Sequence, residues 1–292
     1  MDLGRVGIWT NTLDAQPVSL AQEAAAELEE LGFGAIWYPE SVQREAMANA
    51  ALLLSGTRRI VVASGIANIY ARDALTMMNG ARTLHDAFPD RFLCGIGVSH
   101  RPNVEGVRGH NYGPPLATMR SYLDAMAAAP FAGHAAATEA PLALAALGPK
   151  MLALSAQRTR GAHPYFVPPE HTAVARAALG PDAWLMPEQT VILETDPSAA
   201  RQLARNFTER YLALENYTNN LRRLGFGDED LAGAGSDRLV DAVVAWGSID
   251  QVAARVRAHL DAGADHVCIQ ALEADPRALP QRSWRALAAA LL

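Results

Sequence analysis

The feature that most constrains the fold is a regular alternation of short apolar runs with longer segments of helical pattern. The apolar runs occupy residues 6–10, 35–39, 60–63, 92–98, 142–147, 162–167, 184–194 and 266–272. The third run is apolar on both faces, as strands of a parallel sheet are when helices cover them. The helical segments occupy residues 18–31, 45–54, 73–88, 116–128, 150–158, 170–178, 197–246 and 284–291, and Ser248 with Gln251 opens one further helix by a capping box. This order predicts a parallel α/β fold.

Eight strand–helix units favour one (β/α)8 TIM barrel, which we expect to form a single domain over residues 1–292. A single domain of this size is unusual except for barrels. A doubly wound open sheet is the alternative. It is less favoured because no Gly-x-Gly-x-x-Gly motif follows the first run and because eight units suit closure better.

Residues 196–247, between the seventh and eighth strands, are too long for an ordinary connection. Asp196 and Pro197 form a typical helix start, and apolar residues then recur near helical spacing. This pattern predicts a helical insertion packed on the barrel. Connections that follow barrel strands emerge at the catalytic face, so we expect the insertion to lie over the barrel mouth.

Composition and charge narrow the class of protein. The net charge is -6 and no basic run occurs, so we expect a small-molecule substrate and no nucleic acid partner. No apolar run is long enough to span a bilayer, so we expect no membrane partner. Cys94 and Cys268 lie in apolar runs and are predicted to be reduced core thiols. With no signal peptide recognised, the expected location is the cytoplasm, and no metal site is predicted.

Small and polar residues follow the third strand, where a parallel α/β fold places its ligand. Ser64, Gly65, Ile66 and Ala67 come directly after the apolar run, and Asp73 starts a helix. The carboxyl ends of parallel strands form the ligand site in both barrels and open sheets. We therefore expect these four residues after the strand to contact a bound molecule.

Five short motifs carry a resemblance to a known family. They are Ala-Ile-Trp-Tyr-Pro-Glu-Ser at 35–41, the stretch 64–73, Gly-Ile-Gly-Val-Ser-His at 95–100, Ala-Leu-Gly-Pro-Lys at 146–150 and Gly-Ala-His-Pro-Tyr-Phe at 161–166. In this order and spacing, the chain resembles the luciferase-like monooxygenase superfamily, and within it the actinobacterial branch of coenzyme F420-dependent oxidoreductases. The resemblance covers residues 6–272. It implies a flavin or deazaflavin at the C-terminal mouth of a barrel, hydride transfer and a homodimer.

The resemblance also implies roles for residues near the third and fourth strands. In relatives, the position of Ser64-Gly65 carries a non-prolyl cis peptide within a bulge that supports the middle ring of the cofactor, and Ile66 and Ala67 continue that contact. An ordinary strand end, bent at its glycine, is the alternative. Asn103 matches a residue that contacts the cofactor ring in relatives.

Glu40 and Ser41 end the second strand. Related sugar-phosphate dehydrogenases have an acidic residue and a histidine there, so Ser41 replaces the expected base. Serine without a partner is a poor general base, and we expect Ser41 only to line the substrate pocket. Glu40 is our second candidate for proton transfer, or a ligand to the deazaflavin or a substrate hydroxyl. A helix-capping carboxylate is the alternative.

Three histidines differ in their expected roles. His100 follows the fourth strand, where those relatives have an acidic proton donor. An imidazole can do the same work near neutral pH, so His100 is our first catalytic candidate. His163 ends the sixth strand and is a candidate for the pocket wall, with a structural hydrogen bond as the alternative. His85 lies inside a helix and is interpreted as structural.

Two further positions are candidates for binding. Gly148-Pro149-Lys150 opens a helix, where free N–H groups and the helix dipole suit an anion, so Gly148 and Lys150 are candidate contacts to a cofactor phosphate. Such helix starts also occur without a ligand. Trp9 ends the first strand and is a candidate for the pocket, with a core tryptophan as the alternative.

The resemblance thus implies an oxidoreductase that moves hydride between coenzyme F420 and a small organic substrate. One alternative is a two-component monooxygenase that uses reduced FMN. A second is a diverged barrel that binds cofactor without turnover, which the missing histidine at Ser41 leaves open. No feature of the sequence identifies the substrate.

Overall fold

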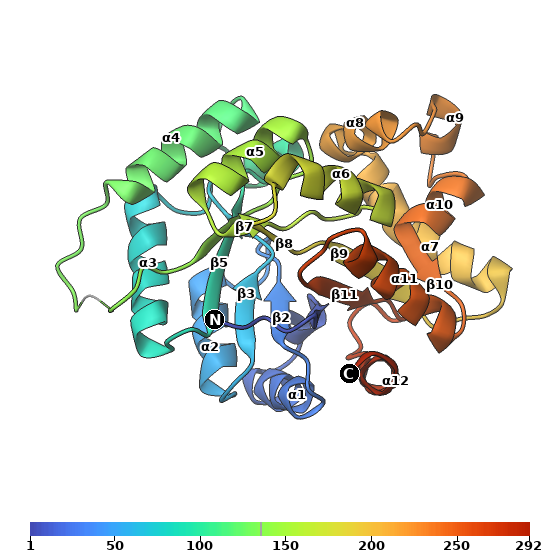
Figure 1. Ribbon diagram of the computed structural model, residues 1–292, viewed down its shortest axis with the longest axis horizontal. Coiled ribbons are helices and arrows are strands. Elements are labelled where there is room, and N and C mark those ends of the chain that lie inside the picture. Colours follow the sequence, from blue (N-terminus) through green and yellow to red (C-terminus); the bar gives the residue numbers. More distant parts are fainter. Residues whose placement is uncertain (135) are drawn as a thin grey trace.

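A computed structural model describes residues 1–134 and 136–292, with a parallel sheet at its centre and helices around it (Figure 1). The strands are β1 (Val6–Trp9), β2 (Ala35–Tyr38), β3 (Val61–Ser64), β4 (Ala67–Asn68), β5 (Phe92–Gly97), β6 (Leu142–Leu144), β7 (Gly161–Ala162), β8 (Trp184–Leu185), β9 (Glu188–Ile192), β10 (Val244–Trp246) and β11 (Val267–Ala271). Their order is β10-β9-β11-β1-β2-β3-β5-β6-β7-β8, with β4 paired to β5. The prediction of a parallel α/β fold is confirmed.

The sheet is curled, and the seventh predicted strand contacts both β7 on one side and β11 on the other. That run is divided at Met186 and Pro187 into β8 and β9, because proline has no N–H to continue a ladder. The Met186 N–H donates to the Ala162 carbonyl of β7, and the Cys268 N–H of β11 donates to the Pro187 carbonyl, each at 2.9 Å. The two bonds tie β7 and β11 to the same stretch, which makes the sheet TIM-barrel-like.

Helices cover the outside of the sheet. They are α1 (Val18–Glu30), α2 (Ala46–Ser55), α3 (Ala74–Ala87), α4 (Pro115–Ala127), α5 (Pro149–Arg158), α6 (Pro169–Leu179), α11 (Ile249–Asp261) and α12 (Gln281–Leu291), with four more described below. The predicted capping box of α11 is present, since the Ser248 N–H donates to Gln251 Oε1 at 2.8 Å. Among the described helices, none is long and apolar enough to cross a membrane.

The core has two layers because side chains of a strand point alternately to its two faces. Inside the curled sheet, Trp37, Leu93 and Cys268 pack in one buried cluster. Outside it, alternate residues such as Ile36 pack against the covering helices. Both Cys268 and Cys94 are buried free thiols, as predicted.

The segment after β9 contains α7 (Pro197–Leu212), α8 (Glu215–Arg223), α9 (Asp228–Leu231) and α10 (Asp237–Val243). Figure 1 shows these helices in orange shades at one end of the molecule's long axis. They enclose a buried cluster of their own that includes Phe207, Leu221 and Val240. The predicted helical region 197–246 was wrong at its end, because Val244–Trp246 forms β10 and pairs with β9.

Candidate active site

A cavity of about 700 Å³ opens where the strands of the curled sheet end. Its wall contains nine of the twelve predicted site residues: Trp9, Glu40, Ser41, Gly65, Ile66, His100, Asn103, Gly148 and His163. They lie at or just after the ends of six different strands. The topology therefore brings together residues separated by up to 154 positions, from Trp9 to His163.

The other three predicted residues do not line this cavity. Ser64 is fully buried, and its hydroxyl donates to the Gly95 carbonyl at 2.8 Å. Ala67 is fully buried in β4. Lys150 is exposed in the first turn of α5. These side chains support the surrounding backbone or point to solvent.

Gly65 forms the floor of the cavity. The cis peptide bond is Gly65–Ile66, one residue beyond the predicted Ser64–Gly65. The Trp9 indole donates to the Gly65 carbonyl at 3.1 Å. A Cβ added to Gly65 would lie 2.8 Å from Trp9 Nε1 and 2.9 Å from His163 Nε2. Only glycine fits between these two rings, which leaves bare backbone facing the cavity.

His163 is a fixed, neutral ring beneath this floor. It stacks on Trp37 with ring centroids 4.4 Å apart, and its Nδ1 lies 2.7 Å from the Met186 carbonyl. Burial lowers the pKa of His163 to about 4. A neutral imidazole must place its proton on Nδ1 to donate to a carbonyl, so the Nε2 lone pair faces Gly65. His163 is positioned to shape the site and is a poor proton donor.

Glu40 has its acceptor positions occupied by the protein. Oε1 accepts the Ala46 N–H at the start of α2 at 3.0 Å, and Oε2 accepts the Asn68 N–H at 2.8 Å. Both oxygens also pair with the buried Arg72 guanidinium, with Arg72 Nη1 lying 3.0 Å from Oε2. This geometry matches the helix-capping alternative and leaves Glu40 poorly placed for proton transfer.

His100 reaches the cavity from the chain after β5. Its carbonyl accepts the Asn103 and Val104 N–H groups, each at 3.0 Å. The chain then forms a π-helical turn (Pro102–Val107) that places Asn103 in the same wall. Burial lowers the pKa of His100, while a hydrogen bond with Asn216 of α8 opposes that shift. The ring is therefore neutral at pH 7 and able to accept a proton.

One side of the cavity is aromatic and contains none of the predicted site residues. Tyr165, which follows β7, and Tyr211 and Tyr217 of α7 and α8 line it together. We name these three residues the tyrosine wall. Helical spacing predicts that such positions are buried, but it does not say which cavity a ring will border.

Two arginines, Arg210 and Arg223, line the cavity, and we call them the positive rim. A Cβ on Gly148 would lie 3.5 Å from Arg223 Nη2, so the guanidinium of α8 stands beside the free N–H groups of this helix. Arg210 of α7 also lines the cavity, and both arginines are exposed. The cation that lines the cavity beside Gly148 is thus Arg223, whereas the predicted contact Lys150 does not line it.

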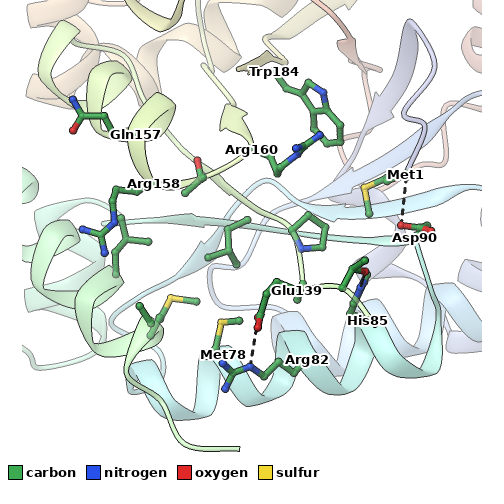
Figure 2. Close-up of a pocket in the computed structure, with 18 residues that line it drawn as sticks. Met1, Met78, Arg82, His85, Asp90, Glu139, Gln157, Arg158, Arg160 and Trp184 are labelled. Atoms are coloured by element: carbon green, nitrogen blue, oxygen red, sulfur yellow. Dashed lines mark hydrogen bonds and ion pairs between the residues drawn. The ribbon is translucent and has the colours of Figure 1, made fainter. Parts of the chain in front are cut away.

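A second cavity, of about 650 Å³, lies at the opposite ends of the strands (Figure 2). It is bordered by Asp90 before β5, Arg160 before β7 and Trp184 at the start of β8. None of the twelve predicted residues lines it. His85 does line it, and its Nε2 lies 2.8 Å from the Thr138 hydroxyl. Ligand sites of barrels lie at the carboxyl ends of strands, so the first cavity is the candidate active site.

No group of three or more histidine, cysteine or acidic side chains could hold a metal ion within residues 1–134 and 136–292.

Residues 2–266 match the model of a protein family described as luciferase-like monooxygenase. This chain belongs to the luciferase-like monooxygenase family. The sequence-based expectation of this family is confirmed, and the curled parallel sheet is the fold expected of a family member.

One protein similar in sequence to this chain comes from Mycobacterium tuberculosis and bears the provisional name coenzyme F420-dependent oxidoreductase Rv3520c. The two are 28% identical over 200 residues, which cover 58% of this chain and 56% of that protein. The chain therefore spans about half the length of this curated relative in the match.

Two solved structures of similar shape bind different cofactors. An F420-dependent secondary alcohol dehydrogenase, in complex with an F420–acetone adduct, has a TM-score of 0.75 at 13% identity, covering 99% of this chain and 98% of that chain. The oxygenating constituent of 3,6-diketocamphane monooxygenase from Pseudomonas putida, in complex with FMN, has a TM-score of 0.68 at 15% identity, covering 98% and 96%. At these identities the likeness establishes the fold alone.

Proposed function

We propose that this protein is an F420-dependent oxidoreductase that transfers hydride between the deazaflavin and a small organic substrate. The observation that carries the proposal is the side-chain-free backbone at Gly65, whose carbonyl is held by Trp9 within the cavity at the strand ends. A planar cofactor ring can lie against such a surface because no side chain projects from it. The name of the mycobacterial relative supports the choice of deazaflavin.

Three parts of the cavity suit different parts of that cofactor. Gly65 and Ile66 would support the ring, and Asn103 would contact its edge. Gly148 and Arg223 would hold an anionic group of the tail, because a helix N-terminus and a guanidinium both favour negative charge. When bound, the deazaflavin supplies a ring carbon that accepts or gives a hydride.

His100 is the residue that we assign to proton transfer. If an alcohol is oxidised, its carbon loses a hydride, its hydroxyl proton passes to the neutral imidazole, and a carbonyl group forms. Asn216 would orient the ring for this step. We assign Glu40 a positioning role, because its oxygens already accept from Arg72 and two backbone N–H groups.

Two further proposals concern the domain organisation and the oligomeric state. Residues 1–292 would form one barrel domain, with residues 196–247 inserted as a roof over its mouth, because Tyr211 and Tyr217 of that segment line the cavity. The family resemblance also favours a homodimer. Analytical ultracentrifugation measures that state directly, and a monomer at micromolar concentration would contradict it.

A two-component monooxygenase that uses reduced FMN is the second candidate, because a related fold binds FMN. Fluorescence titration of the purified protein with deazaflavin and with reduced FMN distinguishes the two. We expect saturable binding of the deazaflavin. Tight binding of reduced FMN with no binding of deazaflavin would replace the proposal with the monooxygenase. Deazaflavin binding without turnover of any alcohol or activated alkene would support the non-catalytic alternative.

A further inference from the structure

The tyrosine wall is a continuous aromatic surface on one side of the cavity. The ring centroids of Tyr165 and Tyr211 lie 5.2 Å apart, and those of Tyr211 and Tyr217 lie 5.3 Å apart. Phe166 and Phe207 pack behind these rings, with centroids 4.7 to 5.5 Å from those of Tyr211 and Tyr217. Such tight support fixes the rings in place, so the wall presents a preformed surface to a ligand.

The hydroxyl groups of the wall are already bonded to the protein. The Tyr165 hydroxyl donates to Gln270 Oε1 at 2.7 Å and lies 2.8 Å from the Tyr211 hydroxyl. Since Tyr165 uses its proton for Gln270, Tyr211 must donate to Tyr165. The Tyr217 hydroxyl bonds to Asn216. The wall therefore offers mainly ring carbon to whatever binds against it.

The charges around the cavity argue against a cationic ligand, although aromatic rings alone can attract one. Glu40 is the carboxylate in the cavity wall, and Arg72 neutralises it. The exposed charged residues that line the cavity are Arg210 and Arg223 of the positive rim. A cation at the tyrosine wall would meet no free carboxylate of the described lining. Glu188 lies near the three tyrosines but does not line the cavity, its oxygens accept from Phe166 and Thr190, and burial raises its pKa to about 7.

The tyrosine wall reaches from His100 to Trp9, which holds the Gly65 backbone. The Tyr217 ring lies 5.5 Å from the His100 ring, and the Tyr165 ring lies 5.1 Å from the ring of Trp9, which donates to the Gly65 carbonyl. A substrate whose hydroxyl or carbonyl reaches His100 therefore places its adjoining group on tyrosine rings.

We propose that the substrate is an uncharged alcohol or carbonyl compound that carries an aromatic or alicyclic ring, and that this ring binds on the tyrosine wall. The substrate class rests on the proposed function, whereas the preference for a neutral ring is a property of the wall itself. Tyr211 and Tyr217 are the residues that would set the preference, and both come from the segment 196–247.

Matched ligands test the preference by calorimetry, without turnover, in protein saturated with deazaflavin. 1-Phenylethanol and 2-propanol share a secondary alcohol and differ by a phenyl group in place of a methyl group. We expect the phenyl compound to bind about 10- to 100-fold more tightly, which corresponds to burial of one aromatic side chain. Equal affinities would overturn the proposal.

A second pair tests the charge. 3,3-Dimethylbutan-1-ol and choline have similar shapes, but only choline is cationic. We expect the neutral alcohol to bind more tightly, and stronger binding of choline would overturn the proposal. If deazaflavin does not bind, the proposed function fails, and the same titrations on the protein with FMN or without cofactor still measure the wall.

Variants identify the residues responsible. Tyr217→Leu should reduce the preference for 1-phenylethanol at least about fivefold, by loss of ring contact, while Tyr217→Phe should retain it. Phe226→Leu is the control, because Phe226 is buried in the same cluster of α7 to α10 but neither lines the cavity nor stacks on the three tyrosine rings. An unchanged preference in Tyr217→Leu, or an equal loss in Phe226→Leu, would show that the wall does not set the preference.

Discussion

Replacing Gly65 with alanine places a methyl group where the structure has no room for one. The new Cβ would lie 2.8 Å from Trp9 Nε1 and 2.9 Å from His163 Nε2, and real Cβ contacts are essentially never below 3.0 Å. Neither ring can move freely. The Trp9 indole is bonded to the Gly65 carbonyl, and His163 is held between Trp37 and the Met186 carbonyl.

Overpacking of this kind costs about 1–3 kcal/mol. We therefore expect Gly65→Ala to lower the free energy of unfolding by that amount in urea denaturation. Trp9 would also have to shift from the cavity floor, so deazaflavin affinity should fall about 10-fold or more, since 1.4 kcal/mol corresponds to a factor of ten. Gly65→Val should be more severe in both measurements, because valine adds two further methyl groups to a Cβ that already lies too close to the Trp9 and His163 rings.

Gly106→Ala is the matched control. Gly106 lies in the π-helical turn of the same face, and a Cβ there would have nothing within 4 Å. It should leave both stability and affinity nearly unchanged. If Gly65→Ala bound deazaflavin as the parent protein does, or if Gly106→Ala lost as much, the role assigned to the Gly65 floor would be refuted.

Three further predictions concern proton transfer, the buried ion pair and the rim. His100→Ala should lower kcat by about 10²- to 10⁴-fold with little change in cofactor affinity, and His85→Ala should not. Burial lowers the pKa of His100, so kcat/KM should stay flat from pH 8 to about 6.5 and fall only at lower pH, where the imidazole gains a proton. A fall in kcat/KM that begins above pH 7 would count against His100 as the base. Glu40→Ala should lower the free energy of unfolding by about 1–3 kcal/mol, because the Ala46 and Asn68 N–H groups lose their acceptor while Arg72 keeps Glu45 as a partner; unchanged stability with abolished turnover would instead restore a catalytic role. In fluorescence titrations Arg223→Ala should weaken deazaflavin binding and Lys150→Ala should not, and the reverse result would return the anion contact to Lys150.

Much of the fold could be predicted because it depends on local patterns. Apolar runs bounded by turns marked nearly every strand, and the ladder pairs them in chain order through most of the sheet. The errors arose where a pattern has two meanings. Val244–Trp246 continues the apolar spacing of α10, yet it pairs with β9, and pairing depends on contacts far away in the chain.

The site could be predicted only where the chain itself determines position. His100, Asn103 and Gly148 follow strands, and the end of a strand has a fixed place in a parallel sheet. Arg223 could not be found in this way, because its proximity to Gly148 depends on how α8 packs. Glu40 follows a strand as well, but its role depends on Arg72, a partner 32 residues away.

The origin of the tyrosine wall has a consequence for how such proteins diverge. Tyr211 and Tyr217 belong to one continuous stretch between β9 and β10, whereas Gly65 and His100 follow strands of the sheet. Changes within that stretch that keep Asn216 beside His100 and Arg223 beside Gly148 can alter which molecules are accepted while the reacting groups stay in place. Selectivity can therefore vary separately from chemistry, and exchanging the stretch between relatives with these two residues retained is a direct route to new specificities.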